Sequence, residues 1–458
     1  MNAFEIKSVL GIAFIYILRM LGLFIVLPIL SVYLLEISAN DSKFLVGLGF
    51  GIYGLTQALL QIPFGLLSDY FGRKKMIIIG LVIFLCGSIL VASFTSIYLV
   101  ILGRALQGAG AISAVLLALL SDLTRDEIRT KAMGIIGASI GITFGVSIIL
   151  APLLNKYIGF QGIFWVIGML TILAILMVVF HIPTPIKAKS EKFLLSNFFE
   201  VLSNKTFLKL DYGIFSLHAS QIVMFMTIPV ILNQLGYPIE YHWQVYLPVF
   251  VLSIVFMVPM IIFAQRKSLI KKLFLGNVLA LIIVQILFIY YSDSKQNIML
   301  ILLIYFVGFN FLEATLPSLI SRISPKNAKG FVLGIYNSSQ SLGIFAGGFF
   351  GGLILTYFSN NSIYILSACL LIVWFLLMLN FIFPENKKDL ILHLKNSFFK
   401  QSKIKIAAVI SKINSLDFVE EALIFPSERY IIIKAKNNKK FNEKKVVKAI
   451  GEDYAISK

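Results

Sequence analysis

The sequence has few charged residues: they make up 14% of its 458 positions, whereas about a quarter of residues are charged in a typical soluble domain. Hydrophobic residues make up 59% and the mean hydropathy is +0.91, so the composition excludes an ordinary soluble protein. The only cysteines, Cys86 and Cys369, lie in apolar stretches without Cys-x-x-Cys spacing, and we expect them to be packing residues. No glycine-rich phosphate-binding loop, zinc-ligand spacing or Ser/His/Asp set occurs. We therefore expect no enzyme activity, no ATP use, no metal and no cofactor.

What the chain has instead is long apolar segments. About 20 apolar helical residues span the ~30 Å hydrocarbon core of a bilayer. Twelve such segments are expected, over 8–30, 44–66, 75–95, 98–121, 132–155, 160–182, 210–234, 244–265, 273–292, 297–321, 330–357 and 361–383. The first belongs to an apolar stretch that is longer than a signal-peptide core and holds an arginine and a proline, so it is interpreted as a transmembrane helix. The sequence thus predicts an all-α membrane protein with twelve transmembrane helices.

The distribution of positive charge predicts how these helices are oriented. The loops after even-numbered segments carry eighteen Lys and Arg residues, and the opposite loops carry only Lys43, Lys156 and Lys295. Because basic loops stay in the cytoplasm, both termini should be cytoplasmic in a multi-pass plasma (bacterial inner) membrane protein. The net charge of +18 then reports topology, and no nucleic-acid partner is expected.

The chain repeats itself at an offset of 200 residues. Gly108 and Gly134 match Gly308 and Gly334, and this register aligns helices four and five with helices ten and eleven. We expect an N-terminal six-helix bundle over 1–182, a cytoplasmic linker over 183–209, a C-terminal bundle over 210–383 and a basic cytoplasmic domain over 384–458.

The segment Gly65–Lys75 places a carboxylate and a basic cluster on a glycine-cornered turn between the second and third helices. An ordinary basic loop accounts for Arg73 and the lysines after it, but not for Gly65, Asp69 and Gly72 in register. The segment resembles the Gly-x-Leu-x-Asp-x-x-Gly-Arg-Lys motif of the major facilitator superfamily. This resemblance covers roughly residues 5–383 and implies two bundles with a substrate site at their interface near the membrane midplane.

The resemblance implies a conformational latch on the cytoplasmic side. In the superfamily, acids and an arginine at these positions form a charge cluster that holds the outward-open state. We assign this role to Asp69, Arg73 and Asp122, and expect Asp69 to cap a helix start while Gly65 and Gly72 allow close backbone approach. The alternative for Asp122 is a simple topology anchor.

Arg104 lies inside helix four, where an unpaired guanidinium costs at least ~2.5 kcal/mol. It resembles the superfamily's fourth-helix Arg-x-x-x-Gly motif, which is associated with proton coupling. The alternative is an arginine that extends to the outer interface.

Helix five carries Gly137, Gly141 and Gly145, followed by Ala151 and Pro152. Glycines four residues apart permit close helix crossing, and a fifth helix of this kind resembles that of the superfamily's antiporters. Ala151 replaces the usual glycine before the proline, and packing alone would also explain the spacing.

His218 on helix seven and Glu313 on helix ten each lie eight residues from the expected cytoplasmic helix ends, about 12 Å deep. They can lie at the same level, where a His–Glu pair could take up and release a proton. The alternative for His218 is a packing histidine. Arg19 in helix one is another buried charge and could counter Glu313 or bind an anionic group. The strings around Arg19 and Glu313, with the basic C-terminal domain, resemble most the YajR-type subgroup of proton-driven, drug-antiporter-like facilitators.

The residues after 384 change in composition, with sixteen Lys and Arg against nine Asp and Glu. Alternating and helical patterns predict the order βαββα, a small ferredoxin-like α+β domain. Its charge favours membrane-surface docking, anionic ligands or RNA, in that order, and the alternative is a stabilising appendage.

These patterns together predict a secondary transporter that works by alternating access, with protons, a small-molecule substrate and the lipid bilayer as its partners. Proton-coupled efflux by a monomer is the leading hypothesis. A uniporter, or a transporter-derived sensor that signals through the C-terminal domain, is the alternative.

Overall fold

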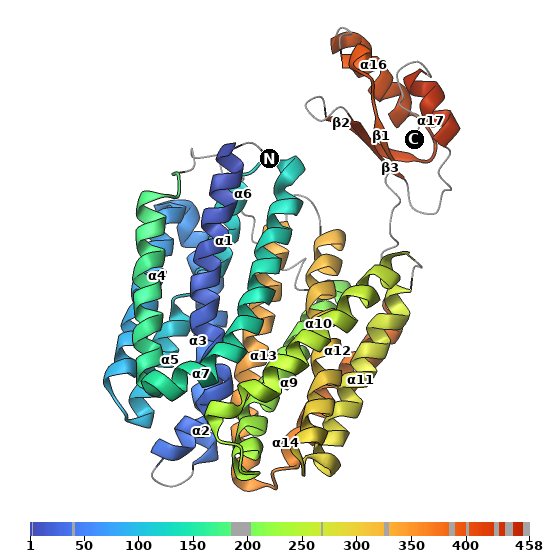
Figure 1. Ribbon diagram of the computed structural model, residues 1–458. Coiled ribbons are helices and arrows are strands. Elements are labelled where there is room, and N and C mark those ends of the chain that lie inside the picture. The colour runs from blue at the N-terminus through green and yellow to red at the C-terminus, as the bar shows by residue number, and fades with distance from the viewer. Residues whose placement is uncertain are drawn as a thin grey trace. The chain divides into compact units, whose positions relative to one another are not determined.

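The computed structural model describes residues 1, 3–38, 42–184, 203–266, 269–324, 329–383, 390–399, 403–425, 430–435 and 443–451. It divides into two compact units, Met1–Ile382 and Phe383–Lys458 (Figure 1). Most of the expected linker, and the turn expected at 426–428, lie outside the described residues.

The first unit is a bundle of long helices. In chain order these are α1 (Ala3–Phe24), α2 (Leu27–Ile37), α3 (Lys43–Phe71), α4 (Arg73–Ser93), α5 (Ile97–Ala109), α6 (Ser113–Asp122), α7 (Asp126–Phe180), α9 (Lys205–Gln234), the short 3₁₀ helix η1 (Ile239–Tyr241), α10 (Trp243–Arg266), α11 (Ile270–Tyr291), α12 (Lys295–Ile323), α13 (Lys329–Tyr357) and α14 (Ser362–Leu379). Among the described residues, eleven continuous segments are long and apolar enough to cross a membrane.

One of these segments, Lys131–Phe180, is 50 residues long and accounts for two of the twelve expected crossings. The helix α7 breaks at Gly159, whose φ of 67° and ψ of 176° are not helical. A positive φ is tolerated by glycine because it has no Cβ. The break falls between the expected spans 132–155 and 160–182, so the eleven segments correspond to the twelve expected spans.

Two other crossings are each made of two helices, which the sequence did not predict. The helix α1 ends at Phe24 and α2 begins at Leu27, with Pro28 in its first turn, where a missing N–H costs no hydrogen bond. The helix α5 ends at Ala109 and α6 begins at Ser113. The backbone groups released by the second break become part of the site described below.

The two halves of the bundle meet most extensively through α3 and α13, which lie side by side in Figure 1. Gly47, Gly51 and Gly54 of α3 face the backbone of α13 so closely that a Cβ at any of them would collide with it. A third helix, α9, packs on α13 through Gly343 and Gly347, which lie against the backbone of Phe215 and Ala219. The glycines of α13 therefore let it lie close to the backbone of α9.

The second unit contains β1 (Leu390–His393), the helices α15 (Asn396–Phe399) and α16 (Lys403–Asn414), β2 (Val419–Phe425), β3 (Tyr430–Ala435) and α17 (Glu443–Ile450). The sheet order is β1-β3-β2, and both neighbouring pairs are antiparallel. Side chains from the strands and from α16 and α17 share one small core, which includes Leu392, Ile413, Ile431 and Val446. The strands with α16 and α17 follow the predicted order βαββα, and the four-residue helix α15 was not predicted.

Candidate functional site

Glu313 and His218 meet inside the second half of the bundle, as the sequence predicted. Glu313 Oε2 lies 3.9 Å from His218 Nε2, although α9 and α12 extend beyond the expected ends. The His218 side chain is 6% exposed and that of Glu313 is 34% exposed. Glu313 Oε2 itself is buried and has no hydrogen-bond partner.

The hydrogen bonds of His218 indicate which of its ring nitrogens carries the proton. Its Nδ1 lies 3.2 Å from the carbonyl oxygen of Ile214, which can only accept, so Nδ1 donates. Its Nε2 lies 2.6 Å from the amide nitrogen of Gln340 on α13, and therefore accepts. The ring is thus neutral in this arrangement, and a proton arriving at Nε2 would have Glu313 as its nearest carboxylate. Gln340 was missed in the sequence, because a lone glutamine on a glycine-rich helix carries no signal of its contacts.

Aromatic residues surround this pair. Phe309 packs edge-on to His218, with ring centroids 5.8 Å apart. Tyr305 stacks on Phe309, with ring centroids 5.8 Å apart, and the hydroxyl of Tyr336 is buried without a hydrogen-bond partner among the described residues. Pro317 in α12 has no N–H to donate to the Glu313 carbonyl, so this turn of the helix lacks one backbone hydrogen bond.

Arg104 is 1% exposed, so it does not extend to a membrane interface. Its guanidinium lies 4.7 Å from the centre of the Tyr53 ring, and Nη1 donates to Gln107 Oε1 at 2.9 Å. Gln107 in turn donates to Ser88 Oγ. Among the described residues no carboxylate lies within ion-pair distance of Arg104, and its Nε has no partner. The charge is therefore compensated only by a ring and an amide.

Arg19 is also buried, but it does not pair with Glu313. Its two terminal nitrogens donate to Ser113 Oγ at 2.9 Å and to the Gly110 carbonyl at 3.2 Å. Both acceptors lie at the break between α5 and α6, where the Gly110 carbonyl is outside the helical hydrogen-bond pattern. Tyr16 donates to the same break, at the Ser113 carbonyl.

The charge cluster predicted around Arg73 is present. Arg73 forms ion pairs with Asp69, four residues before it, and with Asp122 at the end of α6, and it donates to Ser68 Oγ at 2.6 Å. All of these residues belong to the first half, and Figure 1 shows α3, α4 and α6 in that part of the bundle.

The expected local reasons for this cluster were partly wrong. Asp69 lies in the last turn of α3 and does not cap a helix start, because α4 begins at Arg73 after the turn at Gly72. Gly72 has a φ of 98° and open space around it, so its role is the turn and not close approach. A Cβ on Gly65 would lie 3.9 Å from that of Ala114, an ordinary contact, so Gly65 does not bring backbones together either.

The glycines of α7 behave differently from one another. Gly145 lies directly against the Phe250 ring of α10, a contact that leaves no room for a Cβ. The space beside Gly137 and Gly141 is open among the described residues, so the predicted close crossing is absent at these two positions. Pro152 is buried within the helix. Cys86 and Cys369 are exposed on helix surfaces, which corrects their expected packing role.

Other contacts between the halves lie away from the Asp69 end of α3. Lys43, the first residue of α3, donates to Asn360 at 3.0 Å, and Lys156 lies 5.7 Å from the centre of the Tyr241 ring. Ser31 donates to the Phe225 carbonyl at 3.1 Å. That carbonyl is free to accept because Pro229, four residues later, has no N–H.

A further ion pair was missed in the sequence. Glu5 in the first turn of α1 accepts two hydrogen bonds from Arg125, at 2.7 and 3.2 Å, and its side chain is 3% exposed. The pair joins the start of α1 to the turn before α7.

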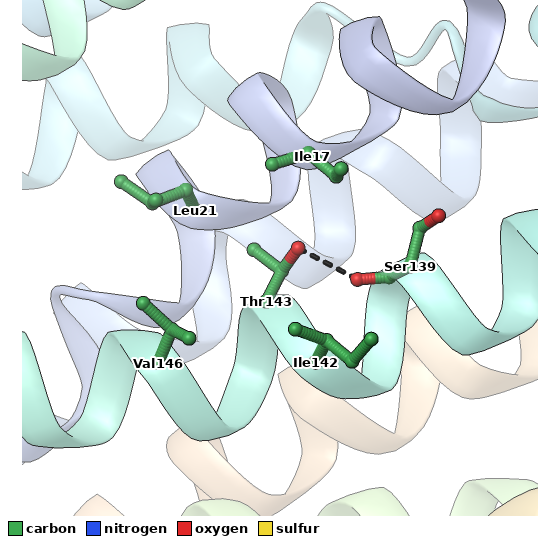
Figure 2. A pocket seen from close by; sticks show the side chains of 6 residues that line it. All are labelled: Ile17, Leu21, Ser139, Ile142, Thr143 and Val146. Atoms are coloured by element: carbon green, nitrogen blue, oxygen red, sulfur yellow. Dashed lines mark hydrogen bonds between the residues drawn. The ribbon is translucent and has the colours of Figure 1, made fainter. Parts of the chain in front are cut away.

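A hollow of about 150 Å³ lies between α1 and α7 (Figure 2). It is lined by Ile17, Leu21, Ser139, Ile142, Thr143 and Val146. The hydroxyl of Thr143 donates to the Ser139 carbonyl and that of Ser139 to the Ile135 carbonyl, so neither needs a ligand. The hollow is apolar and carries none of the site's polar groups.

Many membrane-crossing helices with charged groups buried at the interfaces between them define a class, the polytopic membrane transporters. The fold is shared with a solved D-xylose-proton symporter, with a TM-score of 0.67 at 17% identity over 84% of this chain and 99% of that one. The Major Facilitator Superfamily model matches residues 12–319 and 311–412. The chain belongs to the Major Facilitator Superfamily.

Two relatives place the chain more closely within this family. The inner membrane transport protein YajR of Escherichia coli (strain K12) is 36% identical over 97% of this chain and 98% of its own length. The class H tetracycline resistance protein of Pasteurella multocida is 30% identical over 33% of this chain and 38% of its own length.

Proposed function

We propose that this transporter exchanges protons for a small solute or drug, which it exports by alternating access. The observation that carries the proposal is the buried, unpartnered Oε2 of Glu313 beside the neutral ring of His218. A carboxylate removed from water strongly favours its protonated form unless a cation compensates it. Uptake of a proton at this pair and its later release would couple the proton gradient to the conformational change.

The names of similar proteins support drug export and proton coupling in general. One is named as a tetracycline resistance protein and one structural neighbour as a proton symporter. Neither name identifies the substrate of this protein. Among the described residues, no paired arginines for a defined anion adjoin Glu313 and His218. The ring of Phe309 packs on His218 and that of Tyr305 stacks on Phe309, which favours apolar or cationic solutes.

We propose that the conformation described here is the one closed at the Lys43 end. The backbone contacts of α3 with α13 lie in the first half of α3, whereas the Asp69–Arg73–Asp122 cluster lies at its other end, about 22–33 Å along the helix from these contacts. Within this proposal the cluster fixes α3, α4 and α6 as one body, and in the opposite conformation it would hold the Asp69 end closed. Arg104 and Arg19 would act as fixed positive charges in the cavity walls.

We further propose an inner-membrane location with both termini in the cytoplasm. The excess of basic residues in one set of loops supports it, and the relative YajR is named as an inner membrane transport protein. For the second unit we propose a ferredoxin-like fold. The order β1-β3-β2, with β3 antiparallel to both neighbours, supports it.

The proton coupling is tested in inverted membrane vesicles that hold a proton gradient. Ethidium or tetraphenylphosphonium is added, and the internal pH is followed for the wild type, Glu313→Gln and the control Asp293→Asn, which changes an exposed carboxylate. We expect cation-dependent proton release in the wild type and the control, and its loss in Glu313→Gln.

Full proton release in Glu313→Gln would overturn the role of Glu313. If no tested cation gives a response in any form of the protein, a uniporter or a sensor that signals through the second unit becomes the better hypothesis.

A further inference from the structure

Phe144 is the centre of an aromatic cluster that joins the two halves of the bundle. It lies on α7, in the first half, and is 5% exposed. Four rings of the second half surround it, with centroids 6.1 to 6.3 Å from its own: Phe225 on α9, Phe250 on α10, and Phe306 and Phe309 on α12. These distances are within the range of favourable aromatic pairs. The second half therefore holds one phenyl ring of the first half in an aromatic pocket.

This pocket shares a wall with the Glu313–His218 site. The ring of Phe309 packs on Phe144 and also, edge-on and at 5.8 Å between centroids, on His218. Tyr305 stacks on Phe309 at 5.8 Å. Glu313 comes four residues after Phe309 and so lies on the same face of α12. A group in the place of Phe144 would thus share a neighbouring ring with His218.

Phe144 lies at the edge of the packed part of this interface. The next residue, Gly145, is in direct contact with the Phe250 ring. One and two turns closer to the start of α7, Gly141 and Gly137 have open space beside them among the described residues. A solute in the open part of the interface could therefore reach Phe144.

Opening of the Lys43 end requires Phe144 to leave the pocket, because Phe144 and the four rings belong to different halves. The four rings come from three helices of the second half, so the pocket remains when Phe144 has left. It is then a space for one phenyl group with aromatic walls. Apolar cavities of this kind stay dry and bind aromatic guests such as benzene.

We propose that this pocket is the subsite for an aromatic ring of the transported solute, and that Phe144 fills it when no solute is bound. The ring of the solute displaces that of Phe144. Because Phe144 is one of the contacts between the halves, its displacement weakens the closure of the Lys43 end and couples solute binding to opening there. The inference rests on the proposed function and names its substrate class, an apolar or cationic compound with at least one flat aromatic ring.

The test compares the binding of two cations of equal charge to the full chain in lipid nanodiscs, by equilibrium dialysis. Tetraphenylphosphonium carries phenyl rings, and tetrabutylphosphonium carries none. We expect Phe144→Ala to bind tetraphenylphosphonium at least about 10-fold more tightly than the wild type, because a site that is free in only a minor fraction of molecules loses affinity by that fraction. Tetrabutylphosphonium should gain no comparable affinity.

The control Phe288→Ala removes a ring that is buried to a similar degree, on α11, where it stacks on Tyr364 at 5.4 Å. It should bind both cations as the wild type does. This control separates the proposed pocket from any cavity left by a missing ring.

Phe306→Leu tests the wall of the pocket and keeps the inference testable if Phe144→Ala does not fold. It keeps an apolar side chain but removes one of the four rings. We expect the preference for tetraphenylphosphonium over tetrabutylphosphonium to fall by roughly 2- to 10-fold, which is the worth of one aromatic pair.

The outcomes distinguish this inference from the proposed function. If Phe144→Ala gains no affinity for tetraphenylphosphonium, or gains as much for tetrabutylphosphonium, the pocket is not an aromatic subsite, although proton coupling at Glu313 stands. An unchanged preference in Phe306→Leu would also overturn the inference. If neither cation binds to any form of the protein, the inference is wrong as well, and the vesicle assay with Glu313→Gln decides the proposed function separately.

Discussion

At the scale of single residues, the buried Arg104 and the exposed Arg125 provide opposite tests of what a charged side chain does in this protein. Arg104 is buried with no carboxylate partner among the described residues, whereas Arg125 neutralises the buried Glu5. Removing an uncompensated buried charge relieves its desolvation cost, but removing one member of an ion pair leaves the other uncompensated.

We therefore expect Arg104→Met to keep or raise the melting temperature of the purified protein while abolishing cation-dependent proton release in vesicles. Arg125→Met should lower the melting temperature, because it removes two hydrogen bonds that the buried Glu5 carboxylate accepts. Thermal unfolding in one detergent compares the two. A large loss of stability in Arg104→Met would mean that this arginine has a structural role.

The sequence predicted the individual members of the site better than their partners. Glu313 and His218 were identified because titratable groups are rare in apolar helices, and Arg73 and Asp122 were identified through the resemblance to the superfamily's charge cluster. Both of these pairs form. Arg19 was expected to counter Glu313 or bind an anionic group, because nothing in the sequence shows that the chain breaks at Gly110 and that the carbonyl there accepts from Arg19. Gln340 was missed because its importance depends on how α9 and α13 face each other.

At the scale of helices and turns, Gly72 is the position where backbone conformation matters most in the Asp69–Arg73–Asp122 cluster. Its φ of 98° turns the chain between α3 and α4 and brings Arg73 back toward Asp69. A residue with a Cβ is strained in this region by about 1–3 kcal/mol.

Gly72→Ala should therefore lower the melting temperature and weaken the ion pairs of Arg73. The matched control is Gly65→Ala, in the interior of α3, where a Cβ has room and alanine favours the helix by about 0.5–1 kcal/mol. Thermal unfolding of both variants in the same detergent makes the comparison. A melting temperature of Gly72→Ala equal to that of the wild type would show that the turn at Gly72 tolerates a side chain.

The hydropathy of the sequence predicted the long helices. The break in α7 at Gly159 lies between two of the predicted spans. The breaks between α1 and α2 and between α5 and α6 were not predicted, because a helix that is apolar on both sides of a break has no change in composition to mark it. Contacts decide such breaks: Ser31 just beyond the first and Ser113 at the second both hydrogen-bond to other helices.

At the scale of the whole molecule, alternating access requires the contacts between the two halves to open. Lys43 and Asn360 make such a contact, at the end of α3 that we propose to be closed in this conformation. We expect cysteines at these two positions, in a protein whose Cys86 and Cys369 are replaced by serine, to be bridged by a short bifunctional methanethiosulfonate reagent.

The bridge should stop cation-dependent proton release in vesicles, and a reductant should restore it, because the halves could then separate again. Each single-cysteine variant, treated in the same way, is the control. Undiminished transport by the bridged protein would show that this end does not open in the cycle.

The ion pair of Glu5 with Arg125 has a practical consequence for anyone who produces this protein. Because the fifth residue is already part of the folded bundle, a fusion partner joined directly to the first residues would compete with α1 for space and charge. An affinity tag before Met1 should therefore be separated by a flexible spacer, and an acidic tag sequence should be avoided there, since it would offer Arg125 a rival carboxylate.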